Sequence, residues 1–316
     1  MLGNSVVQSQ SPPSLTLPRR KSGLPDLRIE VPYPGKPGYG GGGNRPRRLD
    51  AQSTIFQSNR ARGTIALAVA AADGVTRRTR VHESGSLRVR FPNTQDGLEA
   101  VVVNTGGGMT GGDAFSVDID VGKSARLVAG TAAAEKIYRS AGPDAAMNVR
   151  LSVGTGGRLA WLPQETILFD RARLKRRIDV DLADDASLVM AEAVLFGRAA
   201  MGEAMRDGFW ADTWRVRRGG KLVFAENVRL DGDIAEKLAR PASAAGCIAL
   251  ATVLVAPADE TILEAVRALG FSGEAGISAW NGIAVARLVA SDGAALRRDL
   301  VAILAALGQS VPRLWH

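Results

Sequence analysis

Apolar and polar residues alternate one by one through the middle of the chain, from about residue 63 to about residue 230. A period of two places successive side chains on opposite faces of a strand, so this pattern predicts half-buried β-strands. It is clearest in residues 87–91, 115–121 and 178–182. Gly219 and Gly220 separate two such runs and predict a hairpin turn. Helical periodicity is scarce here, so we expect a mainly β body at residues 54–240, built as a sandwich, a barrel or a β-solenoid.

The last part of the chain, residues 241–316, has a different pattern. Apolar runs at 247–255 and 283–289 predict strands, and apolar residues at helical spacing in 258–269 predict a helix that Gly270 ends. Ser291 can cap a last helix whose apolar positions run from 296 to 307. The order β-α-β-β-α predicts a small C-terminal α+β part with two helices, packed on the β body.

Residues 1–50 form a separate unit by composition. They hold eight of the fourteen prolines, and eight basic side chains against three acidic ones. Because such a segment cannot bury enough apolar surface to offset its ordering entropy, we expect a disordered, basic, Pro- and Gly-rich tail. The tail carries +5 of the net charge of +8, so the rest of the chain is close to charge balance. A basic tail can be an interaction arm, which leaves a nucleic-acid binder as an alternative function.

The sequence indicates a protein that stays where it is made. It contains no run of about 18 apolar residues, which a membrane span requires, and its first 50 residues contain no apolar core of a signal peptide. Its single cysteine, Cys247, excludes an internal disulfide and lies in an apolar run, where we expect it to be buried. We therefore expect a cytoplasmic protein with no membrane contact.

A glycine-rich stretch at residues 104–113 satisfies the pattern G-x-G-x-x-G after an apolar run. In isolation this pattern indicates a dinucleotide site, but such a site needs a helix that begins at the glycines. Here residues 115–121 alternate as a strand, and no Gly-Lys-Ser/Thr follows as in a P-loop. We therefore interpret the stretch as a sharp turn between strands, with positive φ angles that glycine accepts. A nucleotide-dependent enzyme that uses residues 106–112 remains a second alternative.

Groups for catalysis are few, but some acidic residues occupy unusual positions. His82 and His316 are the only histidines, and no H-E-x-x-H pattern or Cys/His metal spacing occurs. We expect no enzymatic activity, and we expect His82 at the surface of a strand or half-buried. Carboxylates lie in apolar runs or at turns, where an unpaired buried charge is costly. These are Glu192, Glu165, Glu135 and Asp113. Each can point to solvent, and together they indicate a water-lined acidic interior.

Five segments, in their order and spacing, resemble the urease accessory protein UreD family, also called UreH. They are Gly-Gly-Gly-Met-Thr-Gly-Gly-Asp (106–113), Thr-Ala-Ala-Ala-Glu-Lys-Ile-Tyr-Arg-Ser (131–140), Trp-Leu-Pro-Gln-Glu-Thr-Ile-Leu-Phe (161–169), Phe-Gly-Arg-Ala-Ala-Met-Gly-Glu (196–203) and Pro-Arg-Leu-Trp (312–315). The resemblance covers roughly residues 54–316 and leaves the tail outside.

The resemblance implies a fold and a function. The fold is a helical, β-solenoid-like stack of strands with a pair of helices. The function is that of a non-enzymatic nickel-insertion chaperone subunit. Its implied partners are apo-urease, an all-helical UreF-type accessory protein and a P-loop GTPase of the UreG type. A water-filled tunnel is the implied path of Ni²⁺, which passes through without a tightly bound cofactor.

The resemblance also implies path and contact residues. Ni²⁺ binds tightly to imidazole and thiolate, so scattered carboxylates suit a path that must release the ion. The path candidates in the matching motifs are Asp113, Glu165, Glu192 and Glu203, with Glu135 as a weaker one. Tyr138 and Arg139 are candidate contacts for the helical partner, although Tyr138 is equally well explained as a core residue.

Overall fold

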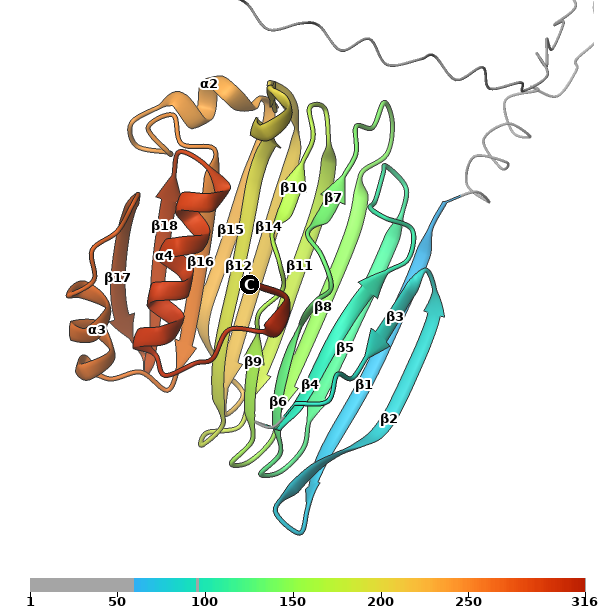
Figure 1. The fold of residues 1–316 in the computed structure, drawn as a ribbon, viewed down its shortest axis with the longest axis vertical. Helices are drawn as coiled ribbons and strands as arrows, with labels where there is room; N and C mark the ends of the chain where they lie inside the picture. The colour runs from blue at the N-terminus through green and yellow to red at the C-terminus, as the bar shows by residue number, and fades with distance from the viewer. Residues whose placement is uncertain (1–59, 95–96, 316) are drawn as a thin grey trace, which may run out of the picture. The chain divides into compact units, whose positions relative to one another are not determined.

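The computed structural model describes residues 60–94 and 97–315, so the predicted tail at 1–50 lies outside the described residues (Figure 1). Two β-sheets dominate this part. The seven-stranded sheet has the order β15-β14-β11-β8-β5-β1-β2. Its strands are β1 (Arg62–Ala72), β2 (Val75–Gly85), β5 (Ala114–Val121), β8 (Ala145–Val153), β11 (Arg173–Leu182), β14 (Asp207–Arg218) and β15 (Lys221–Asp233).

The eleven-stranded sheet has the main order β17-β18-β16-β12-β9-β6-β4-β3, and the short strands β7, β10 and β13 pair beside it. Its strands are β3 (Leu87–Arg90), β4 (Leu98–Asn104), β6 (Arg126–Thr131), β7 (Glu135–Ile137), β9 (Arg158–Trp161), β10 (Thr166–Leu168), β12 (Ser187–Arg198), β13 (Glu203–Ala204), β16 (Ala249–Ala256), β17 (Glu274–Trp280) and β18 (Ile283–Ala290). The helical segments are η1 (Ala199–Met201), α2 (Ile234–Ala239), α3 (Glu260–Arg267), α4 (Gly293–Ala306) and η2 (Arg313–Trp315).

The chain winds as a solenoid between the two sheets. Strands β4, β6, β9 and β12 are parallel neighbours in the eleven-stranded sheet, and β1, β5, β8, β11 and β14 are parallel neighbours in the other. Parallel neighbours need a crossover connection, and here a strand of the opposite sheet supplies it. The predicted mainly β, solenoid-like class is therefore confirmed. The hairpin at Gly219 and Gly220 is confirmed too, because it joins the antiparallel strands β14 and β15.

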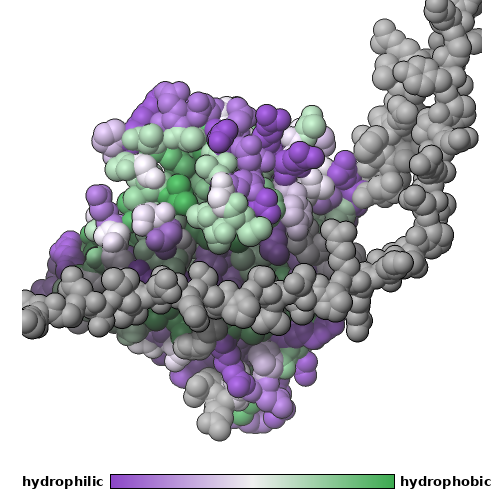
Figure 2. Space-filling view, turned by 45° about the horizontal axis from the view of Figure 1, so that its top comes forward, coloured by the Kyte–Doolittle hydropathy of each residue, from purple (hydrophilic) through white to green (hydrophobic). Residues whose placement is uncertain are grey.

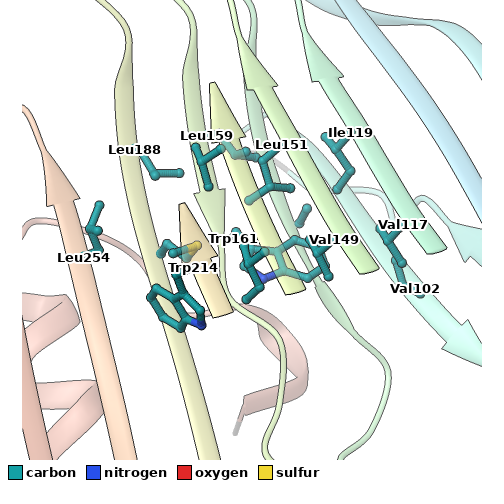
Figure 3. Close-up of a cluster of buried hydrophobic side chains, with 14 of the residues drawn as sticks. Val102, Val117, Ile119, Val149, Leu151, Leu159, Trp161, Leu188, Trp214 and Leu254 are labelled. Atoms are coloured by element: carbon teal, nitrogen blue, oxygen red, sulfur yellow. The ribbon is translucent and has the colours of Figure 1, made fainter. Parts of the chain in front are cut away.

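The main core lies between the two sheets. Along β5, burial alternates residue by residue, so Val117 and Ile119 face inward. Figure 3 shows Val117 next to Val102 of the facing sheet, in the same buried cluster as Ile119 and Leu159. The alternation read from the sequence is thus the signature of a strand with one buried face.

A second core lies on the outer face of the eleven-stranded sheet, where α4 packs on β16 and β18 (Figure 1). Leu296, Leu300, Ile303 and Leu304 are buried in it. The N-cap of α4 is Asp292, whose Oδ1 accepts from the Ala295 amide at 2.8 Å, so the expected cap at Ser291 is wrong by one residue. A carboxylate at this position satisfies a free N–H and also complements the helix dipole.

The C-terminal elements extend the body's own sheet. The structure has the expected order of strand, helix, two strands and helix, and β16 pairs with β12 over eight residues. Cys247 lies just before β16 and is half-buried against the main core, so it is less enclosed than expected. His82 is exposed on β2, as expected.

The face in Figure 2 carries mostly hydrophilic residues around a hydrophobic patch. In the described part of the chain, no helix is both long and apolar enough to cross a membrane.

Candidate functional site

The glycine-rich stretch is a turn between strands, as the sequence predicts. β4 ends at Asn104 and β5 begins at Ala114, so no helix follows the glycines and the nucleotide alternative lacks the element it needs. Gly108 has a φ of 148°, and a Cβ there would lie 2.5 Å from Cε2 of Tyr138 and 2.7 Å from the Lys136 carbonyl oxygen. Both the backbone angle and the close packing therefore require glycine.

Asp113 closes this turn and is almost fully buried. Its Oδ1 accepts from the Ala61 amide at 2.8 Å, and its Oδ2 accepts from the Thr110 amide at 2.7 Å. Both carboxylate oxygens thus have backbone N–H partners. Asp113 holds the turn against the segment that leads into β1.

Glu135 lies on β7, beside the other end of the turn. Asn104 donates from Nδ2 to its Oε1 at 2.9 Å, and the same Nδ2 donates to the Gly108 carbonyl at 3.1 Å. Burial raises the pKa of Glu135 to about 7, against the opposing effects of the Asn104 hydrogen bond and the Lys136 charge. Near neutral pH this carboxyl group is therefore partly protonated.

A cavity of about 130 Å³ lies beside Glu135 and reaches between the two sheets. Its wall includes Asn104 and Gly108 of the turn, and Phe115 and Trp161 from the facing sheets. The indole Nε1 of Trp161 donates to Oε1 of Glu192 at 2.7 Å. Trp161 thus separates the cavity at Glu135 from a buried ionic cluster.

That cluster consists of Glu192 on β12 with Arg176 and Asp212 on the opposite sheet. Arg176 donates from Nε to Oδ1 of Asp212 at 3.0 Å, from Nη2 to Oδ2 of Asp212 at 2.5 Å, and from Nη1 to Glu192. Burial raises the pKa of Glu192, and the Arg176 charge opposes this shift. One guanidinium therefore joins two carboxylates across the main core.

Glu165 anchors the C-terminal end of the chain. It is buried, and both of its oxygens accept from Nη2 of Arg297 on α4 at 2.6 Å. Arg297 also donates from Nη1 to the Trp315 carbonyl at 3.1 Å, and Trp315 donates from Nε1 to the Leu162 carbonyl at 3.2 Å. The motifs at 161–169 and 312–315 thus meet in one contact that docks α4.

Glu203 belongs to a local ion pair. Its Oε1 accepts from the Asp170 amide at 2.8 Å, and Arg198 pairs with its other oxygen. Tyr138 is 38% exposed, packs edge-on against Phe169 and donates its hydroxyl to the Gly107 carbonyl at 3.0 Å. It therefore supports the glycine turn while it leaves part of its ring at the surface.

The five candidate carboxylates do not form one centre. Among residues 60–94 and 97–315, no three His, Cys, Asp or Glu side chains lie close enough to hold a metal ion. Glu135 and Glu192 are connected through the cavity and Trp161, whereas Asp113, Glu165 and Glu203 each have separate partners.

Sequence reasoning missed three residues of these clusters: Arg176, Asp212 and Arg297. A signal existed for the first two. Arg176 lies two positions after Leu174 and two before Ile178, and Asp212 lies midway between Trp210 and Trp214. Because alternate residues of a strand share a face, both charged residues occupy inward positions. A charged residue at an inward position must find a partner in the core.

Comparisons with known proteins agree with the family resemblance of the sequence motifs. The model of the family described as "UreD urease accessory protein" matches residues 61–316. A protein of Rhodopseudomonas palustris (strain HaA2), described as "Urease accessory protein UreD", is 60% identical over 269 residues, which are 84% of this chain and 96% of that protein. A protein of Bradyrhizobium diazoefficiens with the same description is 57% identical over 270 residues, 84% of this chain and 98% of that protein. This chain therefore belongs to the UreD family of urease accessory proteins.

Proposed function

We propose that this protein helps deliver Ni²⁺ to the active site of apo-urease, in a complex with a helical and a GTPase accessory protein. As a UreD family member it is an accessory protein in urease maturation and not a catalyst. The observation that carries the nickel proposal is the cavity beside Glu135, which reaches into the interior as far as Trp161. A cytoplasmic location belongs to the same proposal.

The chemistry of the chain suits passage rather than storage. The whole sequence has two histidines and one cysteine, so few of the ligands that hold Ni²⁺ tightly are present. A carboxylate beside a cavity binds the ion weakly and releases it. Because a metal ligand must be deprotonated, Ni²⁺ and the proton compete for Glu135, whose pKa is about 7. Arrival of the ion thus releases a proton from this carboxyl group near neutral pH.

The other candidate path residues differ from Glu135 in how they are held by their hydrogen-bond partners. Glu192 lies beyond Trp161 on the same route. It can bind the ion only if its hydrogen bond with Trp161 or with Arg176 breaks. Asp113, Glu165 and Glu203 are each held by backbone amides or by an arginine. We therefore propose that these three residues act mainly in holding the structure, and that any contact with the passing ion is secondary. Tyr138 and Arg139 remain candidate contacts for the helical accessory protein.

A matched pair of variants tests the path. Urease is coexpressed with its accessory proteins, including this chain as wild type, Glu135→Gln or Glu274→Gln. Glu274 is an exposed residue of β17 and controls for the loss of one charge. We expect Glu135→Gln to lower the nickel content of purified urease, measured by mass spectrometry, and Glu274→Gln to leave it unchanged. Equal nickel content in both would remove Glu135 from the path.

Co-purification tests the complex itself. A tagged form of this chain should retain apo-urease and both accessory proteins, and Glu135→Gln should retain the same set. Loss of the partners in Glu135→Gln would mean that a lower nickel content reports assembly and not passage.

A further inference from the structure

A second hollow, much larger than the cavity at Glu135, lies on the other side of the glycine turn. Its volume is about 1020 Å³, and among the described residues it shares no lining residue with that cavity. Four of the described lining residues are arginines: Arg60, Arg62, Arg139 and Arg171. None of the lining residues that the structure describes is acidic.

Two glycines of the turn, Gly111 and Gly112, form part of the lining of this hollow. A Cβ on Gly111 would lie 1.9 Å from Oγ of Ser140 and 2.2 Å from the Pro143 carbonyl oxygen, so only a residue without a side chain fits. Gly112 has a φ of 91°, and a Cβ there would lie 3.1 Å from the Arg60 side chain. Asp113 then ties Thr110 to Ala61 through its two oxygens. The turn therefore has a fixed conformation without bulky side chains, and arginines lie around it.

Three of the arginines come from different coils of the solenoid. Arg62 begins β1, Arg139 follows β7, and Arg171 precedes β11. In the seven-stranded sheet β11 lies three strands from β1. At about 4.8 Å per strand, the outer two arginines are spread over roughly 14 Å, which is about four residues of extended peptide.

The charge of these arginines is not balanced within the described part of the chain. The guanidinium groups of Arg62, Arg139 and Arg171 form no ion pair there, and all three residues are exposed. The nearby Arg173, in contrast, donates from Nε to Oδ1 of Asp144 at 2.7 Å. Several like charges around one concave surface create a positive potential that attracts an anion.

We propose that this arginine hollow binds an acidic segment of a partner protein. A guanidinium pairs with a carboxylate through two parallel hydrogen bonds, so three spaced arginines select a segment with several Asp or Glu side chains. The volume is at the upper end of the range for ligand pockets and far exceeds that of a single phosphate ion. Such binding does not depend on the passage of Ni²⁺ past Glu135, and a different measurement tests it.

The probe is a fluorescein-labelled peptide of eight glutamates, and its binding to the full-length chain is measured by fluorescence anisotropy. The test variant carries Arg62→Gln, Arg139→Gln and Arg171→Gln, which keep side-chain length and remove charge. The control variant carries Arg77→Gln, Arg126→Gln and Arg158→Gln, three exposed arginines outside the hollow. Both variants keep the basic tail and have the same net charge, and circular dichroism checks that both are folded.

We expect the wild type and the control variant to bind the peptide, and the test variant to bind it at least about tenfold more weakly, because charge-assisted hydrogen bonds are lost. Binding should also weaken as salt is added. Equal affinity of the two variants, or no binding by the wild type, would overturn the proposal. Inorganic phosphate that displaces the peptide at equal concentration would overturn it too, because the hollow would then be a small-anion site.

Discussion

Replacement of Arg176 by methionine should strongly destabilise the protein. Arg176 lies on β11 and bonds Asp212 on the adjacent strand and Glu192 on the facing sheet. The three side chains are only 2%, 6% and 5% exposed, so water cannot take over the lost contacts. Arg176→Met fills a similar volume but leaves two carboxylates buried without a counter-charge.

The burial of these side chains determines how much stability the variant loses. Removing one partner of a buried ion pair costs about 3–5 kcal/mol, because it leaves an uncompensated charge. A domain is stable by roughly 5–15 kcal/mol, so this is a large fraction of the total. Without the Arg176 charge, burial raises the pKa of Glu192 further. A raised carboxyl pKa contributes stability that is lost as pH rises, so the variant should be less stable at pH 8 than at pH 5.

Urea unfolding followed by tryptophan fluorescence measures this loss, because Trp161 donates directly to Glu192. The control is Arg177→Met on the same strand, which removes an exposed pair with Asp179 and should cost at most about 1 kcal/mol. Adding Glu192→Gln and Asp212→Asn to Arg176→Met should restore much of the stability. The reasoning is refuted if Arg176→Met is as stable as Arg177→Met, or if the added substitutions restore nothing.

Three further predictions concern single sites. Glu165→Ala should cost about 2–3 kcal/mol, because it removes the charged anchor of α4, and hydrogen exchange should increase in α4 while the main core stays protected. The Glu135 carboxyl should contribute up to about 3 kcal/mol of stability that is lost as pH rises from about 4.5 through about 7, because the folded protein keeps the proton of Glu135 to a higher pH than the unfolded chain does. Glu135→Gln should remove this part of the pH dependence in urea titrations, and an unchanged slope would contradict the shift. Gly111→Ala should lower the thermal midpoint because its Cβ meets backbone at 2.2 Å, whereas Gly142→Ala, which has open space, should not.

The mainly β body could be predicted from the sequence because several of its strands, among them β5, β8 and β11, bury one face. Burial along β5 alternates strictly, so its side chains carry the pattern directly. The parallel pairing could not be derived in that way, because alternation reports faces and not neighbours. The solenoid order rested on the family resemblance. α2 was not predicted, since it buries only Ile234 and Leu238 and leaves a weak periodic signal.

The acidic candidates could be named from the sequence, but a sequence does not show which partner satisfies a carboxylate. Their role in a nickel path stays a prediction. Glu165 meets Arg297 across 132 positions, and Glu192 meets Arg176 from the facing sheet. Such long-range pairs depend on the packing of coils, which no local pattern encodes. The glycine turn could be predicted because its positive φ angles are a local property, whereas its close contacts with Tyr138 and Ser140 come from a distant segment and could not be predicted.

The nickel content of urease tests the central claim most directly. Urease is purified from cells that make the enzyme and its other accessory proteins, either with this chain, without it, or with the chain restored from a plasmid. We predict that urease made without the chain is present in normal amount but nickel-poor and inactive, and that restoration returns both nickel and activity. Urease that is fully loaded and active in cells without the chain would contradict the claim.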